Sequence, residues 1–301
     1  HVLTWDADMC DWFFREGYKT DGAYVSADVM KNRLKMYIDE VMTHFEEKYP
    51  GAIYCWDVVN EAVADNAGEF ADDDVSHVRQ VRGGKTNLFY DYIGSDYVEL
   101  AFRYAYETRA KLQAANSKTN IKLFYNDYNT FATYGANKRD AIIQLVKSIN
   151  SFESDGNGGY LKLCDGIGMQ SYIGGYGQQS GCMNDNDITL VKNAIEKFAE
   201  NNVEVHVTEL AVRNYDNDAE PEHAAFYKKL AQTYVDINKA AQAAGKTGPI
   251  TSLSIWGLFD APYLSTADYS YKMNGPYCGL FMELYQPKQS FKEVYEVLAA
   301  E

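Results

Sequence analysis

Short β-rich runs alternate with amphipathic helical stretches along the whole sequence, and this alternation restricts the fold more than any other feature. It is typical of βα units, in which helices connect parallel strands. Several runs are continuously apolar, as strands buried on both faces should be. The candidate strands are residues 1–6, 52–60, 121–126, 166–170, 204–209 and 252–256.

Helical periodicity marks the segments between these strands. Leu34, Tyr37, Ile38 and Val41 fall on one face of a helix, and Ser26 is a suitable N-cap for that helix. The same spacing predicts further helices that cover residues 97–108, 142–149, 190–198, 221–244 and 290–300.

A closed (β/α)8 TIM barrel is the favoured arrangement for so many repeated units, and the visible strands are then its numbers 3 to 8. We therefore expect the first two βα units, and the true N-terminus, to precede residue 1. Residues 1–301 would form one catalytic domain, the C-terminal part of the barrel. The alternative is an open, doubly wound sheet. No GxGxxG motif follows a candidate strand, which weakens that alternative.

Composition argues against several classes of function. The formal net charge of −15 repels phosphate backbones and anionic membrane surfaces, so we expect no nucleic-acid partner. No apolar run reaches the length of about 18 residues that indicates a membrane span. The absence of any CxxC spacing predicts free thiols rather than a zinc site or a full disulfide framework. The cysteines are Cys10, Cys55, Cys164, Cys182 and Cys278.

Two glutamates stand where apolar strands run out: Glu61 after residues 52–60, and Glu209 at the end of 204–209. The long irregular connections follow the strands rather than precede them, and in a βα barrel these connections build the active site. Glycoside hydrolysis needs two such carboxyl groups, one as acid and one as nucleophile or base. Either glutamate alone could be a solvated strand end, but the pair favours a glycosidase.

These segments carry a resemblance to the xylanases of glycoside hydrolase family 10. WDVVNEA at 56–62 and VTEL at 207–210 resemble the acid/base and nucleophile motifs of that family. HVLTW at 1–5 is similar to its third-strand HTLVW, and LFYNDYN at 123–129 to its fifth-strand YNDYN. GIGMQSY at 166–172 and SIWGLFD at 254–260 resemble the GxQxH and WGxxD segments. The resemblance covers essentially the whole chain in the same order.

The resemblance implies a retaining endo-β-1,4-xylanase that uses no metal or cofactor. Glu209 would attack the anomeric carbon, and Glu61 would protonate the leaving oxygen and then activate water. The two carboxyl groups should lie about 5–5.5 Å apart. The implied substrate-binding residues are His1, Trp5, Asn60, Asn126, Tyr128, Gln170, Tyr172 and Trp256. For Asn126, Tyr128 and Gln170, a scaffold role is as good an interpretation, and on sequence alone His1 and Trp5 could equally be core residues.

The chain departs from the family pattern at several positions. Tyr172 replaces the usual His beside the nucleophile, and Ala211 replaces the usual Asp. We expect the Tyr172 hydroxyl to donate to Glu209 in their place. Asp6 stands where a second His is common, and Tyr263 or Leu264 stands where a Trp usually covers the sugar. These changes affect the expected substrate detail more than the reaction type.

Two other functions stay open: a xylan-binding pseudo-enzyme of the same fold, and a barrel endoglucanase. For the xylanase we expect xylan or xylo-oligosaccharides as partners, and a secreted or cell-surface location. Carbohydrate-binding modules could lie outside this sequence.

Overall fold

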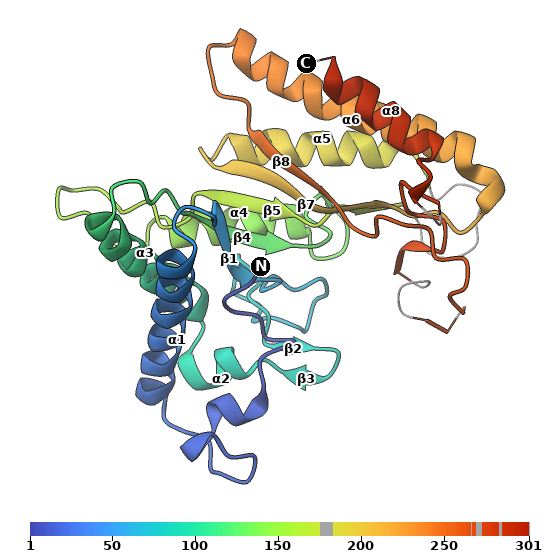
Figure 1. Cartoon of the computed structure of the whole chain (residues 1–301). Coiled ribbons are helices and arrows are strands. Elements are labelled where there is room, and N and C mark those ends of the chain that lie inside the picture. The colour runs from blue at the N-terminus through green and yellow to red at the C-terminus, as the bar shows by residue number, and fades with distance from the viewer. Residues whose placement is uncertain (175–182, 266, 269–272, 283–284, 301) are drawn as a thin grey trace. The chain divides into compact units, whose positions relative to one another are not determined.

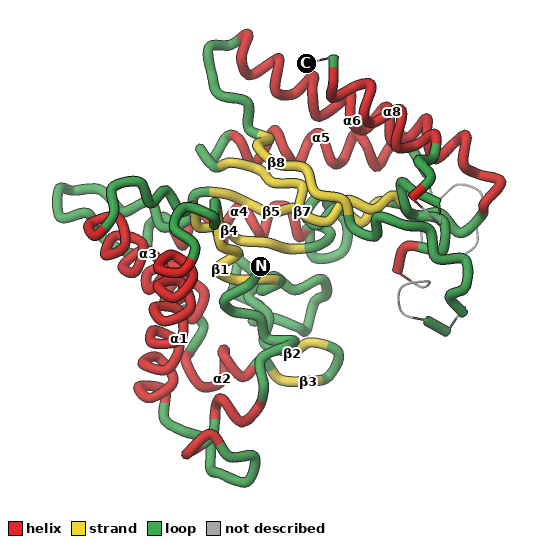
Figure 2. The backbone as a smooth tube through the Cα atoms, in the orientation of Figure 1, coloured by secondary structure: helices red, strands yellow, loops and turns green. Residues whose placement is uncertain are grey.

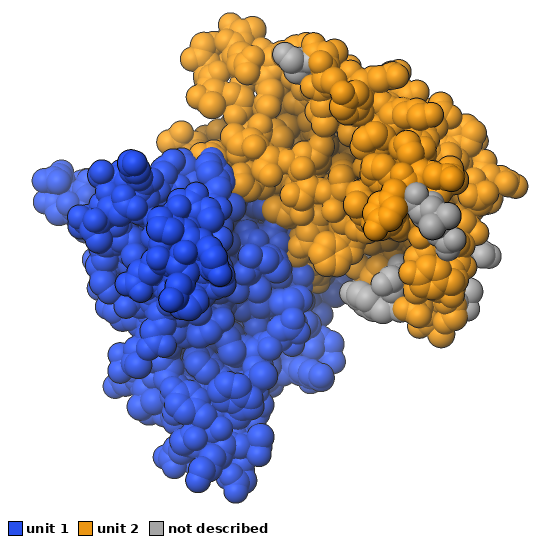
Figure 3. Space-filling model, viewed as in Figure 1, with its two compact units in different colours: residues 1–127, 132–168 blue, residues 128–131, 169–301 orange. Residues whose placement is uncertain are grey.

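The computed structural model describes residues 1–174, 183–265, 267–268, 273–282 and 285–300. The chain divides into two compact units, which Figure 3 shows in different colours. Unit 1 consists of residues 1–127 and 132–168, and unit 2 of residues 128–131 and 169–301. The assignment of residues 1–301 to one catalytic domain stays a prediction.

Unit 1 begins with irregular chain and short 3-10 turns, and its regular elements follow in the order helix, strand, hairpin, helices, strand, helix, strand (Figure 1). They are α1 (Ala27–Lys48), β1 (Cys55–Asn60), β2 (Val81–Arg82), β3 (Lys85–Thr86), α2 (Leu88–Ile93), α3 (Tyr97–Ala115), β4 (Lys122–Asp127), α4 (Lys138–Ile149) and β5 (Gly166–Met169). Only Met169, the last residue of β5, is assigned to unit 2.

The sheet of unit 1 is parallel. β1 pairs with β4 in a register that places Asn60 opposite Asn126, and β5 follows β4 in the strand order. The first residue of β5 has to be glycine, since a Cβ at Gly166 would lie 2.1 Å from the ring of Phe124. Because β1 and β4 are parallel neighbours, their carboxyl ends lie at the same edge of the sheet.

Helices α1 and α3 lie side by side in unit 1 (Figure 1). The Ser26 side chain accepts a hydrogen bond from the backbone of Val29, which confirms the expected N-cap of α1. Met30, Leu34 and Ile38 form the fully buried face of this helix. Thr108 of α3 donates a hydrogen bond to Asp39 of α1 at 2.9 Å, which joins the two neighbouring helices.

Unit 2 has a core of parallel strands with α-helices beside them (Figure 2). β7 pairs in parallel with β6 and with β8. Helix α6 packs on α8 through Ala231, Val235 and Val297, and α5 contacts both α6 and β7. The elements are β6 (Tyr172–Ile173), α5 (Asp185–Ala199), β7 (Glu204–Val212), α6 (Glu220–Ala243), β8 (Ile250–Ile255) and α8 (Gln289–Ala299).

Most expected elements are present, and three expectations need correction. Residues 1–6 form only an isolated parallel bridge between Thr4 and Val59, so the prediction of a strand over these residues is wrong. The connection after β1, at residues 62–95, is one of those expected to be irregular, but it contains the β2–β3 hairpin and α2. β7 continues past Glu209 to Val212, with an irregular register between Val207 and Leu210. The described strands form no closed ring, and none of the described helices combines the length and apolar character of a membrane span.

The described cysteines are all free thiols, as the sequence predicts, and Cys182 lies outside the described residues. Cys10 is exposed, whereas Cys164 and Cys278 are buried. Burial raises the pKa of Cys164 to about 12, and burial together with the nearby Asp260 raises the pKa of Cys278 to about 11. The buried thiols are therefore poor nucleophiles, because the thiolate is the reactive form.

We expect iodoacetamide at pH 8 to alkylate native Cys10 at least about 100-fold faster than Cys164 or Cys278, since Cys10 is exposed, whereas the other two thiols are buried and their pKa values are raised. Peptide mapping by mass spectrometry after timed quenching measures the three rates, with the urea-unfolded chain as control. Equal rates in the native protein would contradict the burial of these two thiols.

Candidate active site

Glu61 follows β1 directly and lies at the carboxyl end of the parallel pair in unit 1. Its backbone amide donates to the carbonyl of Asn126 at 2.8 Å, and the Asn126 side chain donates to that of Asn60 at 3.0 Å. The backbone of Glu61 is left-handed, with φ of 56°, and the residue is only 9% exposed. Three residues expected at the site are thus brought together, with Glu61 in a conformation that non-glycine residues rarely adopt.

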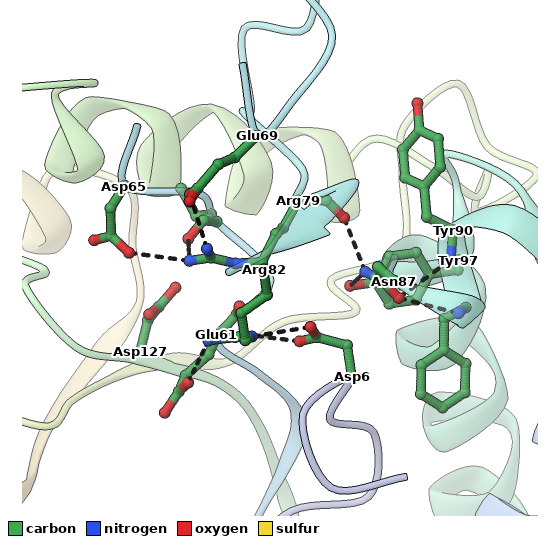
Figure 4. Close-up of polar contacts among 12 residues, drawn as sticks. Asp6, Glu61, Asp65, Glu69, Arg79, Arg82, Asn87, Tyr90, Tyr97 and Asp127 are labelled. Atoms are coloured by element: carbon green, nitrogen blue, oxygen red, sulfur yellow. Dashed lines mark hydrogen bonds and ion pairs between the residues drawn. The ribbon is translucent and has the colours of Figure 1, made fainter. Parts of the chain in front are cut away.

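A network of buried charges lies next to this strand end. The Lys138 ammonium group is 2.8 Å from the carboxylate of Asp127 and 3.2 Å from that of Asp65. Arg79 pairs with Asp65 at 3.1 Å and with Glu69 at 3.0 Å (Figure 4). Lys138 and Arg79 have side chains only 2% exposed, so their charges depend on these carboxylates for compensation.

Asp127, the last residue of β4, is fully buried and accepts a hydrogen bond from the Tyr125 hydroxyl. Burial raises the pKa of Asp127 to about 6, although Lys138 lowers it, and the negative charge of Glu61 adds to the increase. The environment of Asp127 is therefore coupled electrostatically to Glu61.

His1 and Trp5 lie beside β1 in the same unit. His1 Nδ1 is 2.7 Å from a carboxylate oxygen of Asp57, and the rings of His1 and Trp5 meet edge to face at 6.5 Å. The backbone amide of Asn60 donates to the carbonyl of Thr4 at 2.9 Å, which attaches this N-terminal segment to the strand. Both predicted sugar-binding residues therefore lie on a segment attached to β1, and their contact with substrate stays a prediction.

Arg82 is a functional candidate that sequence reasoning missed. Its guanidinium group donates to the carboxylate of Glu61 at 3.0 Å and to the carboxylate of Asp6 at 2.7 and 3.0 Å (Figure 4). A signal for its hairpin was present, because Gly83 and Gly84 separate two short β-type segments, and paired glycines favour a two-residue turn. Both glycines have positive φ, as that turn requires.

Unit 2 holds the other glutamate. Glu209 lies in β7, and β6 pairs with the same strand so that Tyr172 faces Ala211. The Tyr172 hydroxyl donates a hydrogen bond to Oε2 of Glu209, as expected from the sequence. Trp256 follows β8, meets the ring of Tyr172 edge to face at 6.3 Å and is 52% exposed. Glu209, Tyr172 and Trp256 thus form one cluster with an exposed aromatic surface.

The remaining candidates of unit 2 lie at other strand ends. Gln170 is 3% exposed and falls between β5 and β6, and Tyr128 is half-buried directly after β4. Tyr263, where the family usually has a Trp, is 78% exposed. The roles of these residues in sugar binding stay predictions. The separation of about 5–5.5 Å expected between the carboxyl groups of Glu61 and Glu209, which is typical of a retaining enzyme, also stays a prediction.

Comparison with known proteins decides the family. The model of Glycosyl hydrolase family 10 matches residues 1–297. The chain belongs to glycosyl hydrolase family 10. The resemblance of its motifs is thereby confirmed, and so is the fold class, because this family has the (β/α)8 barrel.

Relatives of this family member are named as xylanases. A putative endo-1,4-β-xylanase of Caldicellulosiruptor saccharolyticus is 31% identical over 267 residues, which cover 86% of this chain and 73% of that protein. Endo-1,4-β-xylanase A of Thermotoga neapolitana is 34% identical over 280 residues, 90% of this chain but 21% of that protein. The chain thus spans only about a fifth of this much longer relative.

Solved structures of xylanases are also similar to this chain. The CBM22-1 and GH10 modules of an N-terminal endo-1,4-β-D-xylanase 10B of Clostridium thermocellum, complexed with xylohexaose, give a TM-score of 0.75 at 29% identity. That match covers 98% of this chain and 51% of that one. An intracellular xylanase of Thermoanaerobacterium saccharolyticum gives a TM-score of 0.68 at 31% identity, covering 98% of this chain and 74% of that one.

The raised pKa of Asp127 predicts a pH dependence of stability. The folded state binds a proton at Asp127 below about pH 6, whereas the unfolded chain releases it near its ordinary value of 3.8. Stability from this group is therefore present at low pH and is lost as pH rises from 4 to 7. Asp127→Asn removes the titration and leaves an oxygen that can accept from Lys138 and Tyr125.

The unfolding free energy of the wild type relative to Asp127→Asn should therefore fall by about 1–3 kcal/mol between pH 4 and pH 7. Urea titrations of both proteins at each pH measure this difference, and the variant serves as the reference for all other titrating groups. A difference that stays constant or rises with pH would show that Asp127 is ionised throughout.

Proposed function

We propose that this family 10 chain is a retaining endo-β-1,4-xylanase, with Glu209 as nucleophile and Glu61 as acid/base. In the first step Glu209 forms a bond to the anomeric carbon while the glycosidic bond breaks and the Glu61 proton passes to the departing oxygen. In the second step water attacks the anomeric carbon, gives its proton to Glu61, and releases Glu209 from the ester. Acid and base are thus regenerated.

The observation that carries this proposal is the hydrogen bond from Tyr172 to Glu209. The family's usual His and Asp are both replaced here, which is the reason for considering a pseudo-enzyme. Tyr172 nevertheless supplies a donor to the carboxylate, and Ala211 opposite it leaves no unpaired carboxylate behind. The arrangement supports a rebuilt site rather than a lost one.

The substrate proposed is xylan or xylo-oligosaccharide, supported by relatives that are named endo-1,4-β-xylanases and by one solved in complex with xylohexaose. Because a polymer cannot enter a cell readily, we propose a secreted or cell-surface location, although one relative is described as intracellular. Cell fractionation tests the location, and detection in the cytosol alone would refute it.

Stereochemistry tests the reaction. We expect NMR of xylo-oligosaccharide hydrolysis to show the β-anomer first, because two displacements at one carbon retain configuration. Glu209→Gln should lose at least about 1,000-fold in kcat, and Glu61→Gln should lose activity mainly on unactivated substrates.

Initial release of the α-anomer would refute the double displacement, and undiminished activity of Glu209→Gln would refute the nucleophile. A parallel assay on cellulose distinguishes an endoglucanase. Retention on a xylan gel without turnover would identify the binding protein instead.

Tyr172→Phe isolates the contribution of the rebuilt contact. The substitution keeps the ring that meets Trp256 but removes the donor to Glu209. A hydrogen bond to a charged group is worth roughly 1.5–3 kcal/mol, which predicts a fall in kcat of about 10- to 100-fold.

Steady-state kinetics on xylohexaose measure the effect, with Tyr295→Phe as the matched control, since Tyr295 is 62% exposed on α8. If both variants keep wild-type kcat, the hydroxyl of Tyr172 has no part in the reaction.

A further inference from the structure

Arg82 contacts the proposed acid/base, Glu61, at both its side chain and its main chain. It lies on β2, in a hairpin of the connection that follows β1, and its Nη1 donates to Oε2 of Glu61 at 3.0 Å (Figure 4). Its Nη2 also donates to the backbone carbonyl of Glu61 at 2.8 Å. The same guanidinium group therefore holds both the side chain and the main chain of Glu61.

Asp6 fixes this guanidinium group in place. Its two carboxylate oxygens accept from Nη2 at 2.7 Å and from Nε at 3.0 Å, a bidentate arrangement with defined geometry. The Asp6 side chain is 4% exposed and the Arg82 side chain 24% exposed, so the pair is largely shielded from water. Arginine also stays charged at any pH at which the protein folds. The cation beside Glu61 is thus permanent and positioned.

The backbone of Glu61 needs such support. Its φ of 56° is unfavourable for a residue with a side chain, and such a conformation persists where neighbours hold it. The backbone amide of Glu61 donates a hydrogen bond to the carbonyl of Asn126, and the carbonyl of Glu61 accepts one from Arg82. Arg82 therefore helps to determine where the carboxyl group points.

We propose that Arg82, anchored by Asp6, is a positioning residue for Glu61 and favours its action as an acid. This inference rests on the proposed function. When Glu61 gives its proton to the glycosidic oxygen, it becomes a carboxylate 3.0 Å from a fixed cation, which stabilises the product of that transfer. When Glu61 later takes a proton from water, the same cation opposes the transfer. Arg82 thus accelerates the first displacement and not the second.

Aryl β-xylobiosides separate the two steps. For a phenol that leaves poorly, kcat/KM depends on proton donation by Glu61, whereas dinitrophenolate leaves with little protonation. Arg82→Gln should therefore lose about 10- to 100-fold in kcat/KM on the phenyl substrate and less than about 3-fold on the dinitrophenyl substrate. The kcat on the dinitrophenyl substrate, limited by the second displacement, should stay unchanged or rise.

Arg82→Lys keeps the charge and should recover part of the lost activity on the phenyl substrate. Because Arg82→Gln leaves the nearly buried Asp6 without this partner, a second variant combines it with Asp6→Asn, and thermal melting checks that each variant folds. Arg15→Gln is the matched control, since Arg15 also pairs with an aspartate, Asp11, and with a backbone carbonyl.

Equal losses on both substrates, or no loss on either, in folded variants would overturn the proposal, because a merely structural residue has no dependence on the leaving group. A wild-type chain that hydrolyses neither substrate would overturn the proposed function itself, and this inference with it.

Discussion

Parallel strand pairing is the constraint on which the surroundings of the two proposed catalytic glutamates depend, each within its own unit. In unit 1 the register of β1 and β4 places Asn60 beside Asn126, and Glu61 comes next. In unit 2 the pairing of β6 with β7 places Tyr172 opposite Ala211, within reach of Glu209. Because parallel neighbours end together, polar groups at those ends gather and must find partners there.

The departures from the family motifs are explained by contacts within each unit. Tyr172 pairs in register with Ala211, and its hydroxyl donates to the proposed nucleophile, so the nucleophile has a hydrogen-bond donor without the usual His. Asp6, where a His is common, is neutralised by Arg82, which also binds the proposed acid/base. Each change brings its own compensating partner, which is the expected outcome when an unpaired buried charge is costly.

Much of this could be predicted from sequence, because apolar strands and amphipathic helices have strong periodic signals. The end of β1 at Asn60 was placed correctly, and so was the N-cap at Ser26. The apolar character of residues 1–6 predicts a strand, but it does not reveal how far a segment pairs with its neighbour, and this one forms only an isolated bridge. The sequence does not reveal the contact of Arg82 with Glu61, because that contact depends on how the β2–β3 hairpin folds back onto the end of β1, and periodicity carries no information about that.

The most direct test of the account is to trap the covalent intermediate with a 2-deoxy-2-fluoro-β-xylobioside that carries a good leaving group. The fluorine slows both displacements, and the activated leaving group makes formation of the ester faster than its hydrolysis. We predict that mass spectrometry of digested protein finds one fluoroglycosyl group, attached to Glu209. A label on another residue, or no label on a protein that hydrolyses xylan, would contradict the account.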